Sequence, residues 1–334
     1  MKKVRNCNHS LFNKAKSNKK DEFYTQFSDI EKELSYYKSS FIGKTVYCNC
    51  DDVKVSNFFK YFVLNFDSLG LKKVICSCYK ESNLLNPQCG YYYEYTGSET
   101  KELDFTRIKN FKGDGDFRSL ESIELLKQAD VVVTNPPFSL FREYILQLVN
   151  YDKKFLVISN VNAITYKEVY SLIKDNKVWL GVNLGRGISG FIVPEEYELY
   201  GQETRVNEKG ERIISPNNCM WLTNIINSKH QEFMNLTEKY LGNEAKYPHY
   251  DNFDGIHIDK TKNIPVDYDG AMGVPVTFLH KFNPNQFEII QFRKGDDGKD
   301  LRINGKTPFF RILVKKKNLK PAISSKEVEQ VVLN

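Results

Sequence analysis

The sequence lacks the features that would place it in a specialised class of protein. No apolar run approaches the ~20 residues that a membrane-spanning helix needs, and no apolar signal-peptide segment follows the lysine-rich residues 1–20. Internal repeats and long low-complexity segments are also absent. We therefore expect a cytosolic globular protein, and 334 residues are enough for a large core and two domains.

Cysteines are few and odd in number. An odd count of 7, without a secretory signal, argues against a disulfide framework. Cys48/Cys50 and Cys76/Cys78 form two C-x-C pairs, but the wider spacing of a zinc knuckle is absent. Because alternate residues of a strand share a face, we predict buried strand cysteines and no metal site.

The excess of positive charge is small. With 48 Lys+Arg against 42 Asp+Glu, the net charge of +6 does not by itself indicate nucleic-acid binding. The basic residues gather in two runs, and each run is either a phosphate contact or a solvated end. The runs are Lys14, Lys16, Lys19 and Lys20 near the start, and Lys315, Lys316 and Lys317 near the end.

Strand-like and helix-like segments alternate over the first two thirds of the chain. A helical face runs from Val55 to Phe66, and Asp51 or Asp52 is expected to cap that helix. Ser28-x-x-Glu31 has the pattern of a capping box that opens an earlier helix. The alternation predicts an α/β fold with a mostly parallel, doubly wound sheet. Its strands are expected at 45–50, 73–79, 130–134, 155–159, 177–182, 190–193 and 219–223, with an extra strand or hairpin at 91–95.

The pattern changes after about residue 226. The following sequence is rich in Asn, Asp, Pro, Gly and aromatic residues and has weak helical periodicity. We therefore predict a first domain at 1–226, which includes an N-terminal arm at 1–27, and a second domain at 227–334.

The most informative segment is Asn135-Pro136-Pro137-Phe138, directly after the buried strand 131–134. Ligands of open α/β sheets bind beyond the carboxyl ends of the strands, and two prolines cannot continue a central strand. The turn leaves the Asn135 side chain and the Pro136 carbonyl as hydrogen-bond acceptors, next to the flat ring of Phe138. The alternative is a plain turn between strand and helix.

Those four residues suit an exocyclic amine on a planar ring. Two acceptors that hold both N–H groups free the nitrogen lone pair, while a stacked aromatic ring holds the base. Direct attack on a methyl sulfonium then depends on positioning and electrostatics, without a covalent intermediate. The Pro-Cys nucleophile of cytosine C5 methylation is absent from the chain.

The tetrapeptide resembles motif IV of class I amino-methyltransferases, which act on adenine N6, cytosine N4, guanine N2 or protein glutamine. More extensively, the chain resembles the adenine-specific methyltransferases of the EcoRI restriction–modification type. Segments along nearly the whole chain carry this resemblance: Asp21–Gln26, Val46–Asp52, Gly113–Arg118, Asn135–Tyr144, Trp179–Pro194, Ile213–Asn224 and Met272–Glu288.

The resemblance implies a Rossmann-like class I methyltransferase domain and a C-terminal DNA-recognition domain. It implies S-adenosylmethionine as cofactor, no metal, and N6 methylation of a flipped adenine in double-stranded DNA, at the inner adenine of GAATTC. It further implies a monomer in the bacterial cytoplasm. A cognate restriction endonuclease would act on the same site without a stable complex.

The resemblance also assigns cofactor contacts. Tyr24 and Thr25 match motif X, which closes over the methionine end of the cofactor; a polar lead-in to the helix is the alternative. Asp51 follows the first strand as motif I and would accept from the cofactor's ammonium, although Asp52 could exchange roles with it. The Gly-x-Gly usual at motif I is missing. Glu81 is a weak candidate for the ribose hydroxyls.

The remaining assignments concern the cofactor's adenine and the DNA. Asp116 would accept from the cofactor's adenine amine, with Asp114 as the alternative, and Phe117 would pack against that ring. Phe191 in motif VIII either stacks on the target adenine opposite Phe138 or lies in the core. Arg186 between two glycines, with the lysine runs, would contact DNA.

Two other functions compete with this interpretation. One is an amino-methyltransferase of RNA or of protein glutamine, against which the large second domain and the basic excess argue. The other is a non-catalytic DNA-binding protein, supported by the missing motif I glycines.

Overall fold

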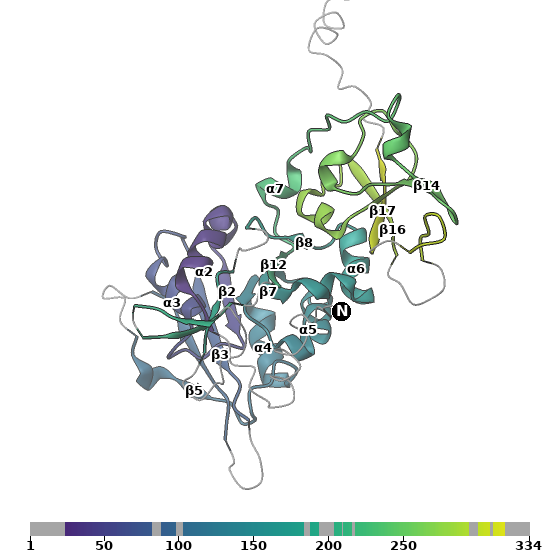
Figure 1. The fold of residues 1–334 in the computed structure, drawn as a ribbon. Coiled ribbons are helices and arrows are strands. Elements are labelled where there is room, and N and C mark those ends of the chain that lie inside the picture. Colours follow the sequence, from purple (N-terminus) through teal and green to yellow (C-terminus); the bar gives the residue numbers. More distant parts are fainter. Residues whose placement is uncertain are drawn as a thin grey trace, which may run out of the picture. The chain divides into compact units, whose positions relative to one another are not determined.

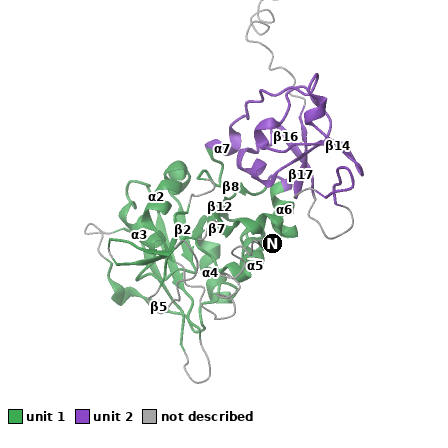
Figure 2. Ribbon diagram, viewed as in Figure 1, with its two compact units in different colours: residues 1–173, 177–227 green, residues 174–176, 228–334 purple. Residues whose placement is uncertain are grey.

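The computed structural model describes residues 24–81, 88–97, 103–183, 188–193, 204–208, 210–215, 218–293, 300–307 and 310–317. The chain divides into two compact units (Figure 2). Unit 1 comprises residues 1–173 and 177–227, and unit 2 comprises residues 174–176 and 228–334. The division after residue 227 lies next to the boundary expected from composition.

Unit 1 is built on an eight-stranded sheet in the order β5-β4-β3-β2-β6-β7-β12-β8 (Figure 1). Only the four central strands β3, β2, β6 and β7 pair in parallel, whereas β4, β5, β12 and β8 pair antiparallel. The strands are β2 (Thr45–Asn49), β3 (Lys73–Cys78), β4 (Tyr91–Tyr95), β5 (Lys109–Asn110), β6 (Val131–Thr134), β7 (Lys154–Asn160), β8 (Trp179–Leu180) and β12 (Cys219–Thr223).

A second sheet in unit 1 is wholly antiparallel. It has the order β1-β9-β11-β10, with β1 (Tyr24–Thr25), β9 (Phe191–Val193), β10 (Thr204–Val206) and β11 (Arg212–Ile214). The expectation that residues 190–193 form a late strand of the main sheet is therefore wrong. A strand-like run predicts extended backbone, but the partner strand is set by contacts that are distant in the sequence.

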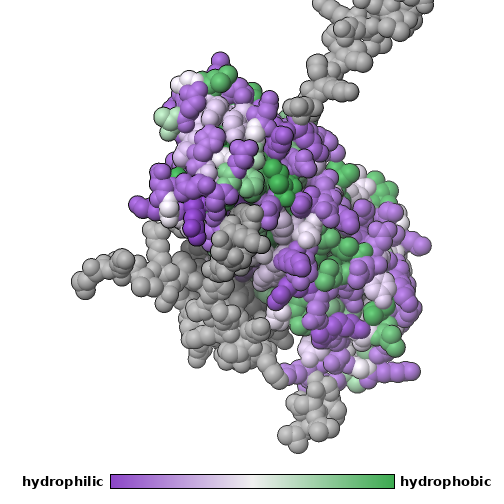
Figure 3. All heavy atoms as spheres, turned by 90° about the vertical axis from the view of Figure 1, so that its right-hand side faces the viewer, coloured by the Kyte–Doolittle hydropathy of each residue, from purple (hydrophilic) through white to green (hydrophobic). Residues whose placement is uncertain are grey.

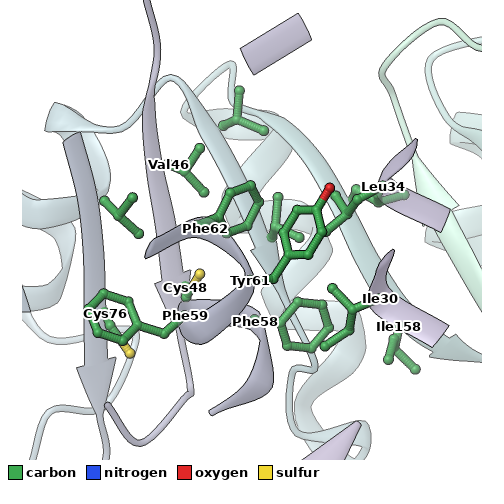
Figure 4. Packing of buried hydrophobic residues seen from close by; sticks show 14 of the residues in the cluster. Ile30, Leu34, Val46, Cys48, Phe58, Phe59, Tyr61, Phe62, Cys76 and Ile158 are labelled. Carbon is green, nitrogen blue, oxygen red and sulfur yellow. The ribbon is translucent and has the colours of Figure 1, made fainter. Parts of the chain in front are cut away.

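Helices cover both faces of the main sheet. They are α2 (Phe27–Leu34), α3 (Asn57–Leu64), α4 (Leu120–Gln128), α5 (Phe141–Asn150) and α6 (Lys167–Lys174), with 3-10 segments at Ser35–Phe41, Phe105–Arg107, Phe138–Leu140 and Val161–Thr165. The apolar side of α3 packs with α2 on Val46 and Cys48 of β2 (Figure 4). On the opposite face, Tyr144 of α5 donates to the side-chain oxygen of Asn49. This two-sided cover confirms the doubly wound α/β prediction. The expectation of a mostly parallel sheet is wrong, because only three of the seven strand pairs in this sheet are parallel.

Two helix starts differ from the sequence expectation. Ser56, not Asp51 or Asp52, caps α3, and its hydroxyl accepts from the Phe59 N–H at 3.1 Å. Helix α2 begins at Phe27 after an N-cap Gln26 that makes no side-chain cap, so Ser28 lies inside the helix. Both errors are local, because several polar residues compete for each cap position.

Unit 2 is built on a five-stranded sheet of order β13-β14-β15-β17-β16. Its strands are β13 (His249–Tyr250), β14 (Phe253–His257), β15 (Met272–Val274), β16 (Phe287–Arg293) and β17 (Arg311–Lys316). Its helices are short: α7 (Ser228–Gln231) and 3-10 segments at Glu244–Lys246, Thr261–Asn263 and Val276–Lys281. Most of β17 is buried, so it forms the centre of this unit's core.

Candidate functional site

The motif IV turn lies at the carboxyl end of β6. The strand ends at Thr134, and Asn135-Pro136-Pro137 leads into the 3-10 helix Phe138–Leu140 and then α5. Pro136 is buried, whereas Asn135, Pro137 and Phe138 keep part of their surface exposed. The strand end that two prolines predict is confirmed. Beside β6 lie β2 and β7, so the turn stands at the centre of the parallel strands.

Phe138 and Phe191 meet edge to face. Their ring centroids are 6.4 Å apart at 65°. Phe138 is partly exposed, but Phe191 is 0% exposed and belongs to the core cluster on the α3 side of the sheet. For Phe191 the structure therefore favours the core alternative, in which its ring packs against Phe138. Phe138 keeps a surface on which a base could stack.

Asp51 joins the ends of β2, β3 and β6. Its backbone N–H donates to the Ser77 carbonyl at 3.0 Å, and its Oδ1 accepts from the Ser56 hydroxyl at 2.8 Å. Its Oδ2 contacts the hydroxyl of Thr134, which also contacts the Asn49 carbonyl. A hydrogen bond thus links the Asp51 carboxyl to Thr134, the residue directly before Asn135.

The two neighbouring aspartates differ in their surroundings. Burial raises the pKa of Asp51 to about 7, against the lowering effect of its Thr134 and Ser56 hydrogen bonds. Burial opposes ionisation of Asp52 too, but the Lys54 N–H at 2.9 Å and the Lys80 ammonium at 3.5 Å help to lower its pKa. Because Asp52 already has a cation, Asp51 is the carboxyl suited to a new one.

The turn after β2 has no glycine at the position that needs one. Cys50 has a φ of 63°, in the left-handed region that glycine normally occupies. This strained position stands where the usual Gly-x-Gly is missing. Cys48, Cys76 and Cys78 are buried in strands as predicted, whereas Cys50 lies just beyond β2 and is partly exposed.

Motif X is hydrogen-bonded to the start of α3, the helix that follows motif I. The carbonyl of Thr25 accepts from Asn57 Nδ2 at 2.8 Å, at the start of α3. The Thr25 hydroxyl oxygen is buried and has no hydrogen-bond partner among the described residues. Gln26 donates to the Ser189 hydroxyl at 2.6 Å and so joins motif X to motif VIII. A buried oxygen without a partner is what a ligand-binding position would leave when no ligand is bound.

The motif III loop carries the predicted Asp116 and Phe117. Both carboxylate oxygens of Asp116 bind the Arg118 guanidinium, at 2.9 and 2.7 Å, and this pairing lowers the pKa of Asp116. Asp114 instead accepts from the Asp116 N–H at 3.0 Å. Phe117 is buried against Tyr144, with centroids 5.2 Å apart. Asp116 is thus held in a fixed position, and Phe117 packs as a core residue.

This loop approaches β3 so closely that only glycine fits. Gly115 has a φ of +81°, and an added Cβ would lie 2.7 Å from the Cys78 carbonyl. The Lys80 N–H donates to the Asp114 carbonyl at 2.9 Å on the same side. The loop therefore sits against the carboxyl end of β3, where the weak candidate Glu81 is exposed.

The basic residues divide into three groups. Lys14, Lys16 and Arg186 lie outside the described residues. Lys315 and Lys317 are exposed at the end of β17. The Lys316 ammonium instead donates to the Val266 carbonyl and pairs with Asp269 at 3.4 Å, with its side chain 14% exposed. The Lys316 ammonium is thus engaged within unit 2, which leaves Lys315 and Lys317 as the better candidates for DNA contact in this run.

Neither a metal cluster nor a membrane-spanning helix is found in the described part of the chain. On the face drawn in Figure 3, hydrophobic side chains are interspersed among hydrophilic ones.

Comparison with known proteins identifies the family. The adenine-specific methyltransferase EcoRI family matches residues 11–317. The chain is 63% identical to the Type II methyltransferase M.EcoRI of Escherichia coli, over 95% of this chain and 99% of that one. The chain belongs to the EcoRI family of adenine-specific methyltransferases. It is a site-specific DNA methyltransferase with a class I methyltransferase fold, and members of this family use S-adenosylmethionine as methyl donor.

Two mycoplasma proteins are more distant relatives. The Type II methyltransferase M.MgeORF184P of Mycoplasma genitalium is 37% identical over 92% of this chain and 99% of that one. The Type II methyltransferase M.MpnI of Mycoplasma pneumoniae is 36% identical over 92% and 98%, respectively. No solved structure matches.

The residues at the strand ends fit the family's cofactor in their chemistry. S-adenosylmethionine carries an ammonium, a carboxylate, a sulfonium and an adenosine group. Asp51 offers a carboxyl that pairs with no cation among the described residues, Thr25 a buried hydroxyl, and Asp116 a fixed carboxylate. These three groups lie on segments that the contacts above bring to one edge of the sheet.

Sequence reasoning missed Ser56 and Thr134. Ser56 orients Asp51 while it caps α3, and Thr134 connects Asp51 to the strand that carries Asn135. A signal for Thr134 was present, because it is the polar residue that ends the apolar run Val131–Val133 at the carboxyl edge of the sheet.

Proposed function

We propose that this enzyme binds S-adenosylmethionine at the carboxyl ends of β2, β3 and β6 and methylates the inner adenine of GAATTC in duplex DNA. The observation that carries the proposal is the placement of Asn135-Pro136-Pro137-Phe138 at the end of β6, with Asp51, in the turn after β2, joined to that strand by Thr134. One edge of the sheet thus brings together a carboxyl for the cofactor and acceptors for the target amine.

Each group has a chemical task in this proposal. The cofactor supplies a methyl group on a cationic sulfur. Asp51 accepts from the cofactor's ammonium, Thr25 closes over the same end, and Asp116 accepts from the cofactor's adenine amine. Tyr24 lies next to Thr25 in β1 and is the second motif X candidate.

The target adenine must leave the DNA stack to reach this edge. The Asn135 side-chain oxygen and the Pro136 carbonyl accept the two N–H groups of its amine, and Phe138 stacks on its ring. Holding both N–H groups lets the nitrogen lone pair point at the methyl group, so the rate gain comes from positioning.

Unit 2 is proposed to read the DNA sequence. Phosphates are contacted by Lys315 and Lys317, by Lys14 and Lys16 of the N-terminal arm, and by Arg186 between its two glycines. The enzyme acts as a monomer in the bacterial cytoplasm. A cognate restriction endonuclease, which cuts the same unmethylated site, needs no stable complex with it.

The test uses labelled S-adenosylmethionine with matched duplexes. One duplex carries GAATTC, one carries it with the inner adenine already N6-methylated on both strands, and one carries GTATTC, while RNA and protein are offered in parallel. We expect label only in the first duplex, recovered as N6-methyladenine, and protection of that duplex from an endonuclease that cuts GAATTC. Equal labelling of the first two duplexes would refute the inner adenine as the methylated base. Labelling of RNA or protein alone would refute duplex DNA as the substrate.

A further inference from the structure

The hydroxyl of Thr134 lies between two hydrogen-bond acceptors. One is the backbone carbonyl of Asn49 in β2, and the other is Oδ2 of Asp51. A threonine hydroxyl has a single proton, so it donates to only one of them at a time. Thr134 is fully buried, so bulk water does not reach the hydroxyl to supply a second donor.

A proton on Asp51 resolves this arrangement. Oδ1 of Asp51 already accepts from the Ser56 hydroxyl, which itself accepts from the Phe59 N–H. A proton on Oδ2 would then donate to Thr134, and Thr134 would donate to Asn49. Each side-chain contact is satisfied when Asp51 is neutral, whereas with ionised Asp51 the carboxylate and the Asn49 carbonyl compete for the single Thr134 proton.

Among the residues that the structure describes, no free cation lies beside Asp51. On its own loop lies Asp52, whose carboxylate is paired with Lys80, and on the motif III loop Asp116 is paired with Arg118. Burial raises the pKa of the phenol and the thiols that face it, so these groups stay neutral at pH 7. They are Cys48 and Cys50 of β2 and its turn, Cys76 of β3, and Tyr144 of α5.

We propose that Thr134 is a positioning residue whose hydroxyl proton turns from the Asn49 carbonyl to Asp51 when the cofactor's ammonium binds and Asp51 releases its proton to solvent. Thr134 directly precedes Asn135. Cofactor binding thereby changes the hydrogen bonding at the end of β6, next to the acceptor Asn135 for the target amine. This inference rests on the proposed cofactor role of Asp51.

The first experiment counts protons. Calorimetric titration with S-adenosylhomocysteine, which keeps the ammonium group, is run at pH 6 in buffers of different ionisation enthalpy. We expect wild type to release about one proton per ligand bound, because a carboxyl with a raised pKa is protonated at that pH. Asp51→Asn should release none. Binding without proton release in wild type would overturn this inference alone, whereas no binding at all would overturn the proposed function as well.

The second experiment tests Thr134 itself through the pH dependence of ligand affinity. In Thr134→Val, the pH midpoint of the ligand-affinity curve should rise by about one unit. The loss of the hydroxyl donor destabilises the ionised Asp51 carboxyl more than the neutral one, which raises its pKa. Thr134→Ser keeps the hydroxyl and should restore the wild-type midpoint.

Thr223→Val is the matched control. Thr223 is also fully buried on a strand, and its hydroxyl donates to the Phe155 carbonyl at 2.6 Å. This variant should lose stability without moving the midpoint. An unchanged midpoint in Thr134→Val, or an equal shift in Thr223→Val, would overturn the positioning role. If Thr134→Val does not fold, the proton count in wild type still tests the release of the Asp51 proton on which the proposal depends, and no release would overturn it.

Discussion

The three lysines near the end of β17 should separate into two kinds when each is neutralised. Lys315 and Lys317 are exposed, whereas the Lys316 ammonium is held by the Val266 carbonyl and Asp269. The double variant Lys315→Gln/Lys317→Gln should therefore weaken DNA binding, and Lys316→Gln should weaken folding.

The size of each effect follows from the contacts. If each exposed lysine neutralises one phosphate, the log–log salt slope should fall by about 1.8, and affinity at 0.1 M salt should drop about 60-fold for specific and non-specific duplexes alike. Sequence preference should not change, because phosphate contacts position without specifying. Lys316→Gln should instead cost about 1 kcal/mol of unfolding free energy, since Asp269 is exposed and the carbonyl contact is the larger loss.

Fluorescence anisotropy over a salt series measures the first effect, and urea unfolding measures the second. The reasoning is refuted if the double variant keeps the wild-type salt slope, which would mean that both lysines face solvent away from DNA. It is equally refuted if Lys316→Gln lowers the salt slope while its unfolding curve matches wild type.

Four further outcomes are expected. Asn135→Ala should slow single-turnover methyl transfer about 10²–10³-fold with cofactor affinity nearly unchanged, and an unaltered rate would exclude its role. Phe138→Ala should cost about 1–3 kcal/mol of base capture, seen as weaker brightening of a fluorescent adenine analogue at the target position. Gly115→Ala should lower the melting temperature far more than Gly43→Ala, because both have positive φ but only Gly115 lacks room for a Cβ. For Asp51, a folded pKa of about 7 above the unfolded value means that cofactor-free stability falls as pH rises from about 4 to 7, and Asp51→Asn should flatten that part of a thermal-unfolding series.

Local sequence was sufficient wherever one physical rule dominated. The apolar run Val131–Val133 closed by two prolines predicted both β6 and the place of Asn135, because prolines cannot extend a central strand. The alternating β and α pattern predicted the central parallel strands for a similar reason. Parallel neighbours need a crossover, and the helical segments between them supply it.

Sequence was insufficient wherever long-range contacts decided the outcome. The engagement of Lys316 depends on Val266 and Asp269, about fifty residues earlier in the chain. The burial of Phe191 depends on a sheet whose other strands include residues 24–25 and 212–214. The residue type allowed Lys316 to contact DNA or to pair internally, and Phe191 to stack on a base or to lie in the core. Only the neighbours in the folded chain distinguish these alternatives.

The edges of the main sheet carry a consequence for behaviour at high concentration. Its two outer strands, β5 and β8, contain only 2 residues each, and β5 is exposed with a lysine in it. A sheet edge this short and charged offers almost no template of unpaired N–H and C=O groups to a second copy. The described edges of the main sheet therefore offer little to edge-to-edge aggregation between copies of the chain.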